Sequence, residues 1–352
     1  MRRCVILAEG GFGPQTSKTA NAVLRFAPTT VVAVIDSLHA GRTAQDVLGY
    51  GGRVPVLSSL EEVMALGPRD LLIGISPPGG QLPKSYRPFV LQALGQGLDV
   101  YSGLHVRLAD DPAFAAAAMD SGVLIHDLRR PPDDLGLAAG RVRDVGATVV
   151  LTVGTDSNIG KMTTLLQVRP AVRALGHRVA FAATGQTGIL LEGSGIAVDA
   201  VVADFIAGAA ERVTLDAARD ADIVLVEGQG SLIHPAYSGV ALGLLHGAMP
   251  HAMIMCAQPT RTTINRHPWV SIPPLSEVIR LTEAMTDTFR PAPVIAIALN
   301  TFDLSDGEAR EAVRRVQNET GLLTTDPVRF GPGAIADAID TFHRERLSGA
   351  AR

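Results

Sequence analysis

The sequence predicts two α/β units in tandem, each built on a parallel sheet. Short apolar runs alternate with helix-like segments, and this alternation begins near Val5 and starts again near Thr148. Runs of four to six apolar residues have the length and character of strands that are buried on both faces, as in parallel sheets. A chain of 352 residues also has room for two domains, since a typical domain has about 150 residues.

The first half of the chain contains five predicted strands. Val5–Ala8 is followed by a glycine-rich loop and by a helix from about Thr19 to Arg25. The other four strands are apolar runs separated by helices or turns: Thr30–Ile35, Leu71–Ile75, Leu98–Tyr101 and Val123–Ile125. The charged, proline-bearing segment Arg129–Asp134 then interrupts the pattern. We therefore expect one domain over residues 1–132 and a second over residues 133–352.

The second half repeats the alternation. Thr148–Val153 is predicted as a strand, and the helix after it runs to Leu175 with Pro170 inside, where we expect a kink. Helical spacing of apolar and charged residues predicts further helices over Leu275–Thr286 and Gly307–Thr320. Four more apolar runs are strand candidates: Arg178–Ala183, Ile223–Val226, Ala252–Cys256 and Val294–Leu299.

The composition excludes several classes of protein. Lys and Arg number 31 against 35 Asp and Glu, for a net charge of −4, so nucleic acid is not expected as the main partner. The only cysteines, Cys4 and Cys256, are too few for a disulfide framework or a structural zinc site. The charge-free segment Gly228–Thr260 is interrupted by prolines and histidines, unlike a membrane-spanning helix. We expect a cytoplasmic protein that does not bind membranes.

The strongest functional motif follows the predicted strand Thr148–Val153. A glycine-rich loop leads into a helix that opens with Lys161, as in P-loop proteins. The glycines let backbone N–H groups point at a phosphate, and the helix N-terminus adds its positive end. The expected ligands of the phosphates are Gly154, Thr155, Asp156, Ser157, Asn158, Gly160, Lys161, Thr163 and Thr164.

This loop departs from the usual P-loop in two ways. Five residues, not four, separate Gly154 from Gly160, a spacing that resembles the dethiobiotin synthetase branch. Met162 stands where a Mg²⁺-binding Ser or Thr normally follows the lysine, so we expect no bound metal. Asn300 follows Val294–Leu299, at a position that often contacts a nucleotide base in that branch. For the glycine-rich loop and for Asn300 alike, the alternative interpretation is an ordinary turn without ligand contacts.

A second group of candidate residues follows Ile223–Val226. Glu227 ends this predicted strand and His234 lies in the charge-free loop beyond it, so both are candidate acid/base groups. Backbone N–H groups between Gly228 and Ser231 are suited to stabilising an oxyanion. Nearby polar side chains, and an arginine suited to pairing with a carboxylate, are the candidate substrate contacts: Gln229, Ser231, Tyr237 and Arg261. Structural roles remain the alternative for Glu227 and His234.

The first half of the chain contains a second glycine-rich loop that resembles the P-loop less closely. The spacing from Gly11 to Lys18 repeats that from Gly154 to Lys161, which makes a second anion site possible: Ser17, Lys18 and Thr19. Serine replaces the last glycine here, and the loop lacks the G-x-G-x-x-G pattern of dinucleotide-binding folds.

Taken together, these motifs resemble those of one family, the D-glutamate N-acetyltransferases, long catalogued as a domain of unknown function. The motifs concerned are Ser17–Asn21, Val32–Asp36, Gly154–Thr164 with its Gly-Lys-Met-Thr-Thr signature, Glu227–Ser231 and His234–Gly239. The resemblance extends from about Val5 to Leu347. It implies a Rossmann-like N-terminal domain, a P-loop NTPase-like C-terminal domain and a homo-oligomer. It also implies acetyl transfer from acetyl-CoA to the amine of D-glutamate, or a related amino acid, in D-amino-acid catabolism.

Two other functions are compatible with the same residues. For the acetyltransferase, Met162 is no obstacle, because acyl transfer needs no nucleotide hydrolysis and a P-loop without a metal ligand can still bind the phosphates of CoA. An ATP-dependent ligase or kinase acting on a small carboxylate with ATP and Mg²⁺, resembling dethiobiotin synthetase, is the main alternative. A nucleotide-binding regulator without enzymatic activity is the second.

Overall fold

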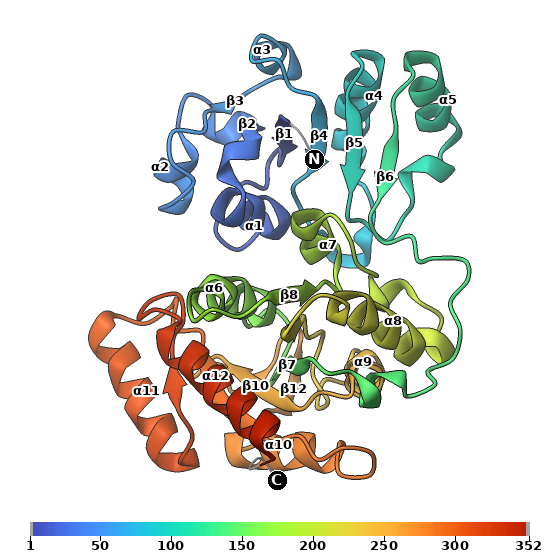
Figure 1. Ribbon diagram of the computed structural model, residues 1–352. Helices are drawn as coiled ribbons and strands as arrows, with labels where there is room; N and C mark the ends of the chain where they lie inside the picture. Colours follow the sequence, from blue (N-terminus) through green and yellow to red (C-terminus); the bar gives the residue numbers. More distant parts are fainter. Residues whose placement is uncertain (1–2, 350–352) are drawn as a thin grey trace. The chain divides into compact units, whose positions relative to one another are not determined.

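The structure is a computed structural model that describes residues 3–349. The chain forms two units: the first contains the residues up to Arg130 together with Ile189–Ala200, and the second contains Pro131–Gly188 and the residues from Val201 onward. Each unit is a parallel sheet flanked by helices (Figure 1), which confirms the predicted α/β class. The sequence pattern gave no sign that Ile189–Ala200 would belong to the first unit.

The first unit contains a six-stranded sheet with the order β3-β2-β1-β4-β5-β6, and all its strands are parallel. The strands are β1 (Cys4–Leu7), β2 (Val31–Ile35), β3 (Val56–Leu57), β4 (Asp70–Ile73), β5 (Asp99–Ser102) and β6 (Ile125–Asp127). The helices are α1 (Lys18–Phe26), α2 (Ala44–Leu48), α3 (Leu60–Met64), α4 (Arg87–Gly95) and α5 (Pro112–Ser121). This strand order is that of dinucleotide-binding folds, in which ligands bind where the order reverses beside the first strand.

Helices cover both faces of this sheet. Alternate residues of β1 enter different cores, because successive side chains of a strand point to opposite faces. Val5 and Leu7 pack in the core that α3, α4 and α5 cover, whereas Ile6 packs with α1 and α2. Leu190 belongs to the second of these cores, which explains why Ile189–Ala200 is part of the first unit.

The second unit contains a parallel sheet with the order β14-β13-β10-β7-β9-β8. The strands are β7 (Thr148–Gly154), β8 (Val179–Ala182), β9 (Ile223–Val226), β10 (Ala252–Ala257), β13 (Val294–Leu299) and β14 (Thr324–Thr325). The helices are α6 (Lys161–Ala174), α8 (Ile206–Ala218), α9 (Ser238–Ala248), α10 (Leu275–Ala284), α11 (Asp306–Thr320) and α12 (Gly333–Ser348). Helix α7 (Gln186–Glu192) begins in this unit, and its residues from Ile189 onward belong to the first. Pro170 lies inside α6 without ending it. Within residues 3–349, no helix has the length and apolar character needed to cross a bilayer.

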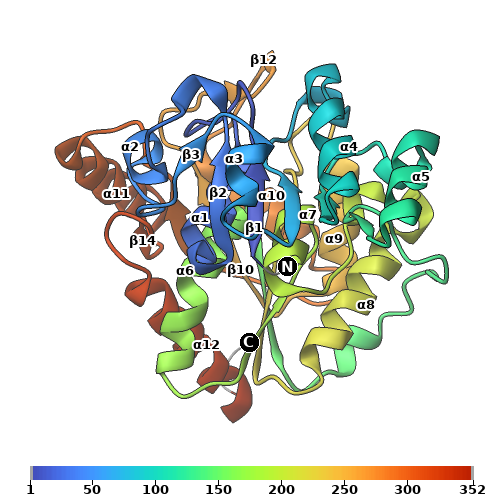
Figure 2. The same cartoon turned by 90° about the horizontal axis from the view of Figure 1, so that it is seen from above.

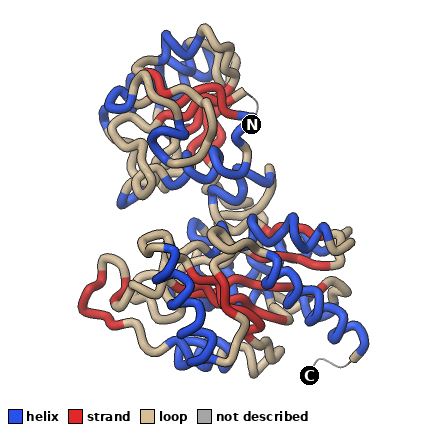
Figure 3. Tube along the Cα trace, turned by 90° about the vertical axis from the view of Figure 1, so that its left-hand side faces the viewer, coloured by secondary structure: helices blue, strands red, loops and turns tan. Residues whose placement is uncertain are grey.

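A small antiparallel hairpin accompanies the second sheet. It consists of β11 (Thr263–Ile264) and β12 (His267–Ser271), and it forms a separate pair of strands outside the main sheet (Figures 2 and 3). The pattern of apolar residues in this segment does not predict a hairpin. Its strands are short, and the turn between them requires Arg266 to adopt a left-handed conformation with φ of 63°.

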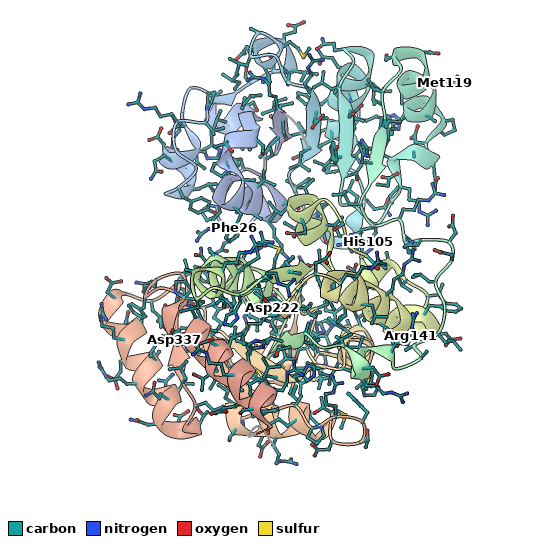
Figure 4. The ribbon with its side chains drawn as sticks, viewed as in Figure 1. Phe26, His105, Met119, Arg141, Asp222 and Asp337 are labelled. Carbon is teal, nitrogen blue, oxygen red and sulfur yellow. The ribbon has the colours of Figure 1, made fainter. Side chains whose placement is uncertain are left out.

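The segment that enters the second unit is fastened to α8. Glu211 of α8 is only 1% exposed, and its carboxylate accepts the backbone N–H groups of Ala139 and Arg141 and the Nε–H of Arg141. Arg141 is labelled beside α8 in Figure 4. Gly208 lies so close to this segment that a Cβ would stand 1.9 Å from the carbonyl oxygen of Gly136. The buried carboxylate and the glycine together determine how the chain enters this sheet.

His251 makes the stability of the second unit dependent on pH. Its Nδ1 accepts the backbone N–H of Val149 at 3.0 Å, and burial, with Arg290 and Arg346 nearby, lowers its pKa from 6.5 to about 3. Between these values only the unfolded chain binds the proton. The stabilisation is therefore complete above pH 6.5 and is lost as the pH falls towards 3, by about 1.4 kcal/mol per pH unit.

We expect His251→Asn, which keeps an acceptor for Val149, to flatten this loss of stability. Urea unfolding of both proteins between pH 4 and pH 7 measures the effect. Equal slopes of unfolding free energy against pH would show that His251 does not contribute.

Candidate functional site

The candidate site lies at the carboxyl edge of the second sheet. All six strands run in the same direction, so the loops that follow them emerge at one edge, where parallel α/β sheets bind ligands. The loop between β7 and α6 is at the centre, between the loops that follow β9 and β10.

The loop between β7 and α6 has the backbone conformation of an anion-binding nest. Gly160 has a φ of 106° and Asn158 a φ of 53°, both in the left-handed region, and such turns direct successive N–H groups into one concavity. Gly154 is equally constrained, because a Cβ there would lie 2.7 Å from Ile159 and 3.0 Å from the carbonyl oxygen of Cys256. The loop therefore has a local backbone conformation suited to an anion, and phosphate binding by it remains a proposal.

Lys161 lies inside this loop. It is 7% exposed, and its Nζ donates to the carbonyl oxygen of Asp156 at 2.7 Å. Its Cδ would be 3.1 Å from a Cβ on Gly228, so the stem of the side chain passes the residue that follows Glu227. The ammonium group is thus held at the nest rather than extended into solvent.

The hydroxyl of Thr164 faces the sheet. Its Oγ1 lies 3.7 Å from the Sγ of Cys256, within reach of the thiol as donor. Burial raises the pKa of the Cys256 thiol to about 11, so this cysteine is not a nucleophile at neutral pH. The side chain of Thr164 thus contributes to packing below the loop, while its backbone is in the first turn of α6.

Asp156 connects the P-loop to the segment after β10. The side chain is fully buried, and its Oδ1 accepts the N–H of Ser157 at 2.6 Å. Its Oδ2 accepts Nη1 of Arg261 at 2.9 Å and the N–H of Asn265 at 2.8 Å. Arg261 also donates to the carbonyl oxygen of Ser157 at 2.9 Å. The predicted substrate contact Arg261 therefore lies against the phosphate loop.

Glu227 is a buried carboxylate beside this loop. It is 4% exposed, and its Oε2 accepts the N–H groups of Thr184 at 3.0 Å and Gly185 at 3.1 Å. Thr184 also donates its hydroxyl to the carbonyl oxygen of Glu227. Gly188 must lack a side chain, since a Cβ would lie 2.3 Å from Oε2. This segment after β8 escaped the sequence analysis, although its two Thr-Gly pairs directly after a predicted strand were a usable signal.

His234 is also buried, and its hydrogen bonds determine its tautomer. Its Nδ1 accepts the N–H of Ala236 at 3.1 Å, so the neutral ring carries its proton on Nε2. Nε2 lies 3.7 Å from Oδ1 of Asp156. Burial lowers the pKa of His234 and keeps the ring neutral. In this arrangement the ring is a donor at Nε2 and has no unused lone pair with which to accept a proton.

The remaining candidates of the second unit are distributed along the same edge. Gln229 donates Nε2 to Thr184 at 3.2 Å, and Ser231 is buried with its Oγ accepting the N–H of Ile233. Tyr237 is 46% exposed and packs on the ring of His234. Asn300 lies at the end of β13, where its Oδ1 accepts the N–H of Phe302 at 3.4 Å.

Gln258, at the end of β10, is a residue that the sequence analysis missed. It is 9% exposed, and its Nε2 donates to Asp303 at 3.0 Å. Within the described chain its Oε1 is buried without a hydrogen-bond partner. Together with Asn300 it supplies amide groups on the β10–β13 side of the P-loop, opposite Glu227 and Thr184.

The glycine-rich loop of the first unit is stabilised by its own side chains. Ser17 donates to the carbonyl oxygen of Gly13 and accepts the N–H of the same residue, while Asn21 donates to it from α1. Thr19 contacts the hydroxyl of Ser76 at 3.2 Å, and Lys18 begins α1. An anion at Ser17, Lys18 and Thr19 remains a proposal.

Comparison with known proteins identifies the family. The model of a domain of unknown function, DUF1611, described as its P-loop domain, matches residues 136–336, and that of its N-terminal Rossmann-like domain matches residues 37–131. The chain belongs to the DUF1611 family. A crystal structure of a DUF1611 family protein from Anabaena variabilis has a TM-score of 0.93 and 41% identity, covering 97% of this chain and 100% of that one.

Two curated relatives of this DUF1611 chain are named D-glutamate N-acetyltransferase. The protein from Tritonibacter scottomollicae is 40% identical over 282 residues, which are 80% of this chain and 84% of the relative. The protein from Pseudoalteromonas sp. is 36% identical over 278 residues, which are 79% and 83% of the two chains. This relationship makes the DUF1611 chain an enzyme of the acyltransferase class.

The site provides a DUF1611 acyltransferase with three groups of different chemistry. The nest with Lys161 suits the phosphates of a ligand. Glu227 is a buried carboxylate, and the Nε2–H of His234 is a neutral hydrogen-bond donor. Asp156 contacts Lys161 through its carbonyl oxygen and Arg261 through its carboxylate.

Proposed function

We propose that the protein transfers the acetyl group of acetyl-CoA to the amine of D-glutamate or a related amino acid, as a cytoplasmic homo-oligomer in D-amino-acid catabolism. The observation that supports this most directly is the buried Glu227 beside a formed P-loop with Met162 in place of the metal-binding hydroxyl. CoA presents a diphosphate and a 3′-phosphate to such a loop, and a nearby carboxylate suits deprotonation of an amine. The names of the two curated relatives agree with this proposal.

The proposed reaction forms one C–N bond and breaks one C–S bond. The ammonium group of the amino acid first gives a proton to Glu227, and the free amine attacks the thioester carbonyl carbon. N–H donors stabilise the negative charge on the tetrahedral oxygen; the candidates are the backbone N–H groups between Gly228 and Ser231 and the Nε2–H of His234. Collapse expels the thiolate of CoA, which takes up a proton as the nitrogen loses its second one. The products are the N-acetyl amino acid, CoA and one proton.

The proposal is tested by incubating the protein with acetyl-CoA and a panel of D- and L-amino acids, with mass spectrometry of the products. We expect N-acetyl-D-glutamate. ATP turnover in the absence of acetyl-CoA would favour the ligase or kinase alternative. Tight binding of a nucleotide with no product from any amino acid would favour the regulator.

We expect turnover to be independent of Mg²⁺, because the side chain of Met162 has no oxygen with which to coordinate the ion and acyl transfer hydrolyses no nucleotide. The initial rate of CoA release, measured with a thiol reagent, should remain near its full value in excess EDTA. A loss of rate that Mg²⁺ restores would indicate a required metal, and would favour the ligase alternative.

A further inference from the structure

The P-loop of this protein has a second cation. The guanidinium of Arg261 donates through Nη1 to the carboxylate of Asp156 and to the carbonyl oxygen of Ser157, both at 2.9 Å. Both acceptors belong to residues of the phosphate loop itself. Arg261 comes from a different element, the turn directly after β10, where its N–H donates to the carbonyl oxygen of Gln258. The loop after β10 thus brings a fixed positive charge to the nest that already contains Lys161.

The arginine is held firmly but is not saturated. Asp156 is fully buried and also accepts the N–H of Asn265, so the carboxylate that orients Arg261 is itself fixed. In the described part of the chain, Nε and Nη2 of Arg261 donate to no protein acceptor, and the side chain is 20% exposed. Three N–H bonds of the planar guanidinium therefore remain for a ligand, in the forked geometry that suits phosphate oxygens.

A diphosphate in a P-loop needs more positive charge than one lysine provides. In most P-loop proteins a magnesium ion supplies it, held by a hydroxyl directly after the lysine. Here that position is Met162. The loss of the hydroxyl and the presence of an oriented arginine are independent observations, and each explains the other if the arginine neutralises the phosphates.

We propose that Arg261 binds the diphosphate of the ligand together with Lys161 and takes the place of the metal ion at this P-loop. The inference rests on the proposed function, in which that diphosphate belongs to CoA; a nucleoside diphosphate has the same chemistry. Arg261 then binds the acetyl donor, and the carboxylates of the acceptor amino acid are bound by other residues. Asp156 is its positioning residue.

The test measures binding directly, by calorimetry in EDTA, so that it does not depend on turnover. We expect Arg261→Gln to raise the Kd of CoA at least about tenfold, as the loss of hydrogen bonds to a charged group implies. ADP is the second probe. If Arg261→Gln raises the Kd of ADP as much as the Kd of CoA, Arg261 binds the diphosphate that the two ligands share. If ADP does not bind even the wild-type protein, the diphosphate that Arg261 binds is that of CoA. Arg280→Gln removes the same charge from an exposed position in α10, and is expected to leave both affinities unchanged.

A kinetic measurement separates this role from the alternative. With Arg261→Gln, the KM of acetyl-CoA should rise and the KM of D-glutamate should stay within about twofold. A rise in the KM of D-glutamate with unchanged affinity for CoA would overturn the proposal and assign Arg261 to the substrate carboxylate. A tenfold gain in the CoA affinity of the wild-type protein on adding Mg²⁺ would also overturn it, because the arginine would not then replace the metal.

Arg261→Lys is a second variant, needed because Arg261→Gln leaves Asp156 with one donor fewer and could unfold the protein. Lysine keeps the charge but not the fork, so we expect a smaller rise in the Kd of CoA, of about threefold, and an unchanged melting temperature. An unchanged Kd in both folded variants would refute the proposal. If the wild-type protein binds CoA but makes no N-acetyl-D-glutamate, the proposed function fails while the role of Arg261 in binding stands.

Discussion

Lys161→Ala is expected to weaken the binding of CoA at least tenfold, which is about 1.4 kcal/mol. The substitution removes the ammonium group that lies inside the nest, while the backbone N–H groups of the loop remain. The substitution also removes the hydrogen bond from Nζ to the carbonyl oxygen of Asp156, so the folding of the variant is measured together with its affinity. Calorimetric titration with CoA gives the affinity, and the melting temperature reports on folding.

The chain offers a matched control for this substitution. Its only other lysines are Lys18 and Lys84, and Lys84 is exposed in the first unit. Lys84→Ala removes the same charge and should leave the affinity for CoA unchanged. Equal affinities of the Lys161→Ala variant and the wild-type protein would exclude this loop as the phosphate site.

The features that the sequence predicted well are those that local physics determines. Gly154 and Gly160 indicated the nest because a left-handed backbone and a close approach each require glycine, whatever the rest of the fold does. The strands β9, β10 and β13 were found because each is a continuous apolar run, and β7 because it is apolar except for two threonines, as expected of strands buried on both faces.

The partners of the site residues were not predictable, because they come from distant parts of the chain. Glu227 meets Thr184, 43 residues earlier, only because the register of β8 and β9 pairs Ala182 with Val226, so that the next residues of both strands emerge side by side. The same holds for Asp156 and Arg261, 105 residues apart. No spacing rule links such pairs, and only the strand order of the sheet brings them together.

The inclusion of Ile189–Ala200 in the first unit was equally hidden. Its leucines resemble those of any helix, and nothing in the composition marks the core to which they belong. Leu190 is 7% exposed because it packs with the core of the first unit. Arg129 and Asp199 form an ion pair within that unit. A boundary drawn from proline and charge alone could not anticipate this return of the chain.

Glu227→Gln is expected to lower kcat by a factor of about 10²–10⁴, the usual cost of removing a general base. Glutamine has the same shape, and its amide oxygen can still accept the N–H groups of Thr184 and Gly185. Folding and CoA affinity should therefore be preserved while the ability to take a proton from the substrate ammonium is lost.

His234→Gln is the informative comparison, because an amide NH₂ can replace the Nε2–H donor but cannot replace a base. The hydrogen bond from Ala236 to Nδ1 makes His234 a donor, so we expect this variant to keep much more activity than Glu227→Gln. If Glu227→Gln keeps more than about a tenth of kcat, its loss of rate is far smaller than the loss of a base usually causes. Together with an inactive His234→Gln, this result would reverse the two assignments and make His234 the base.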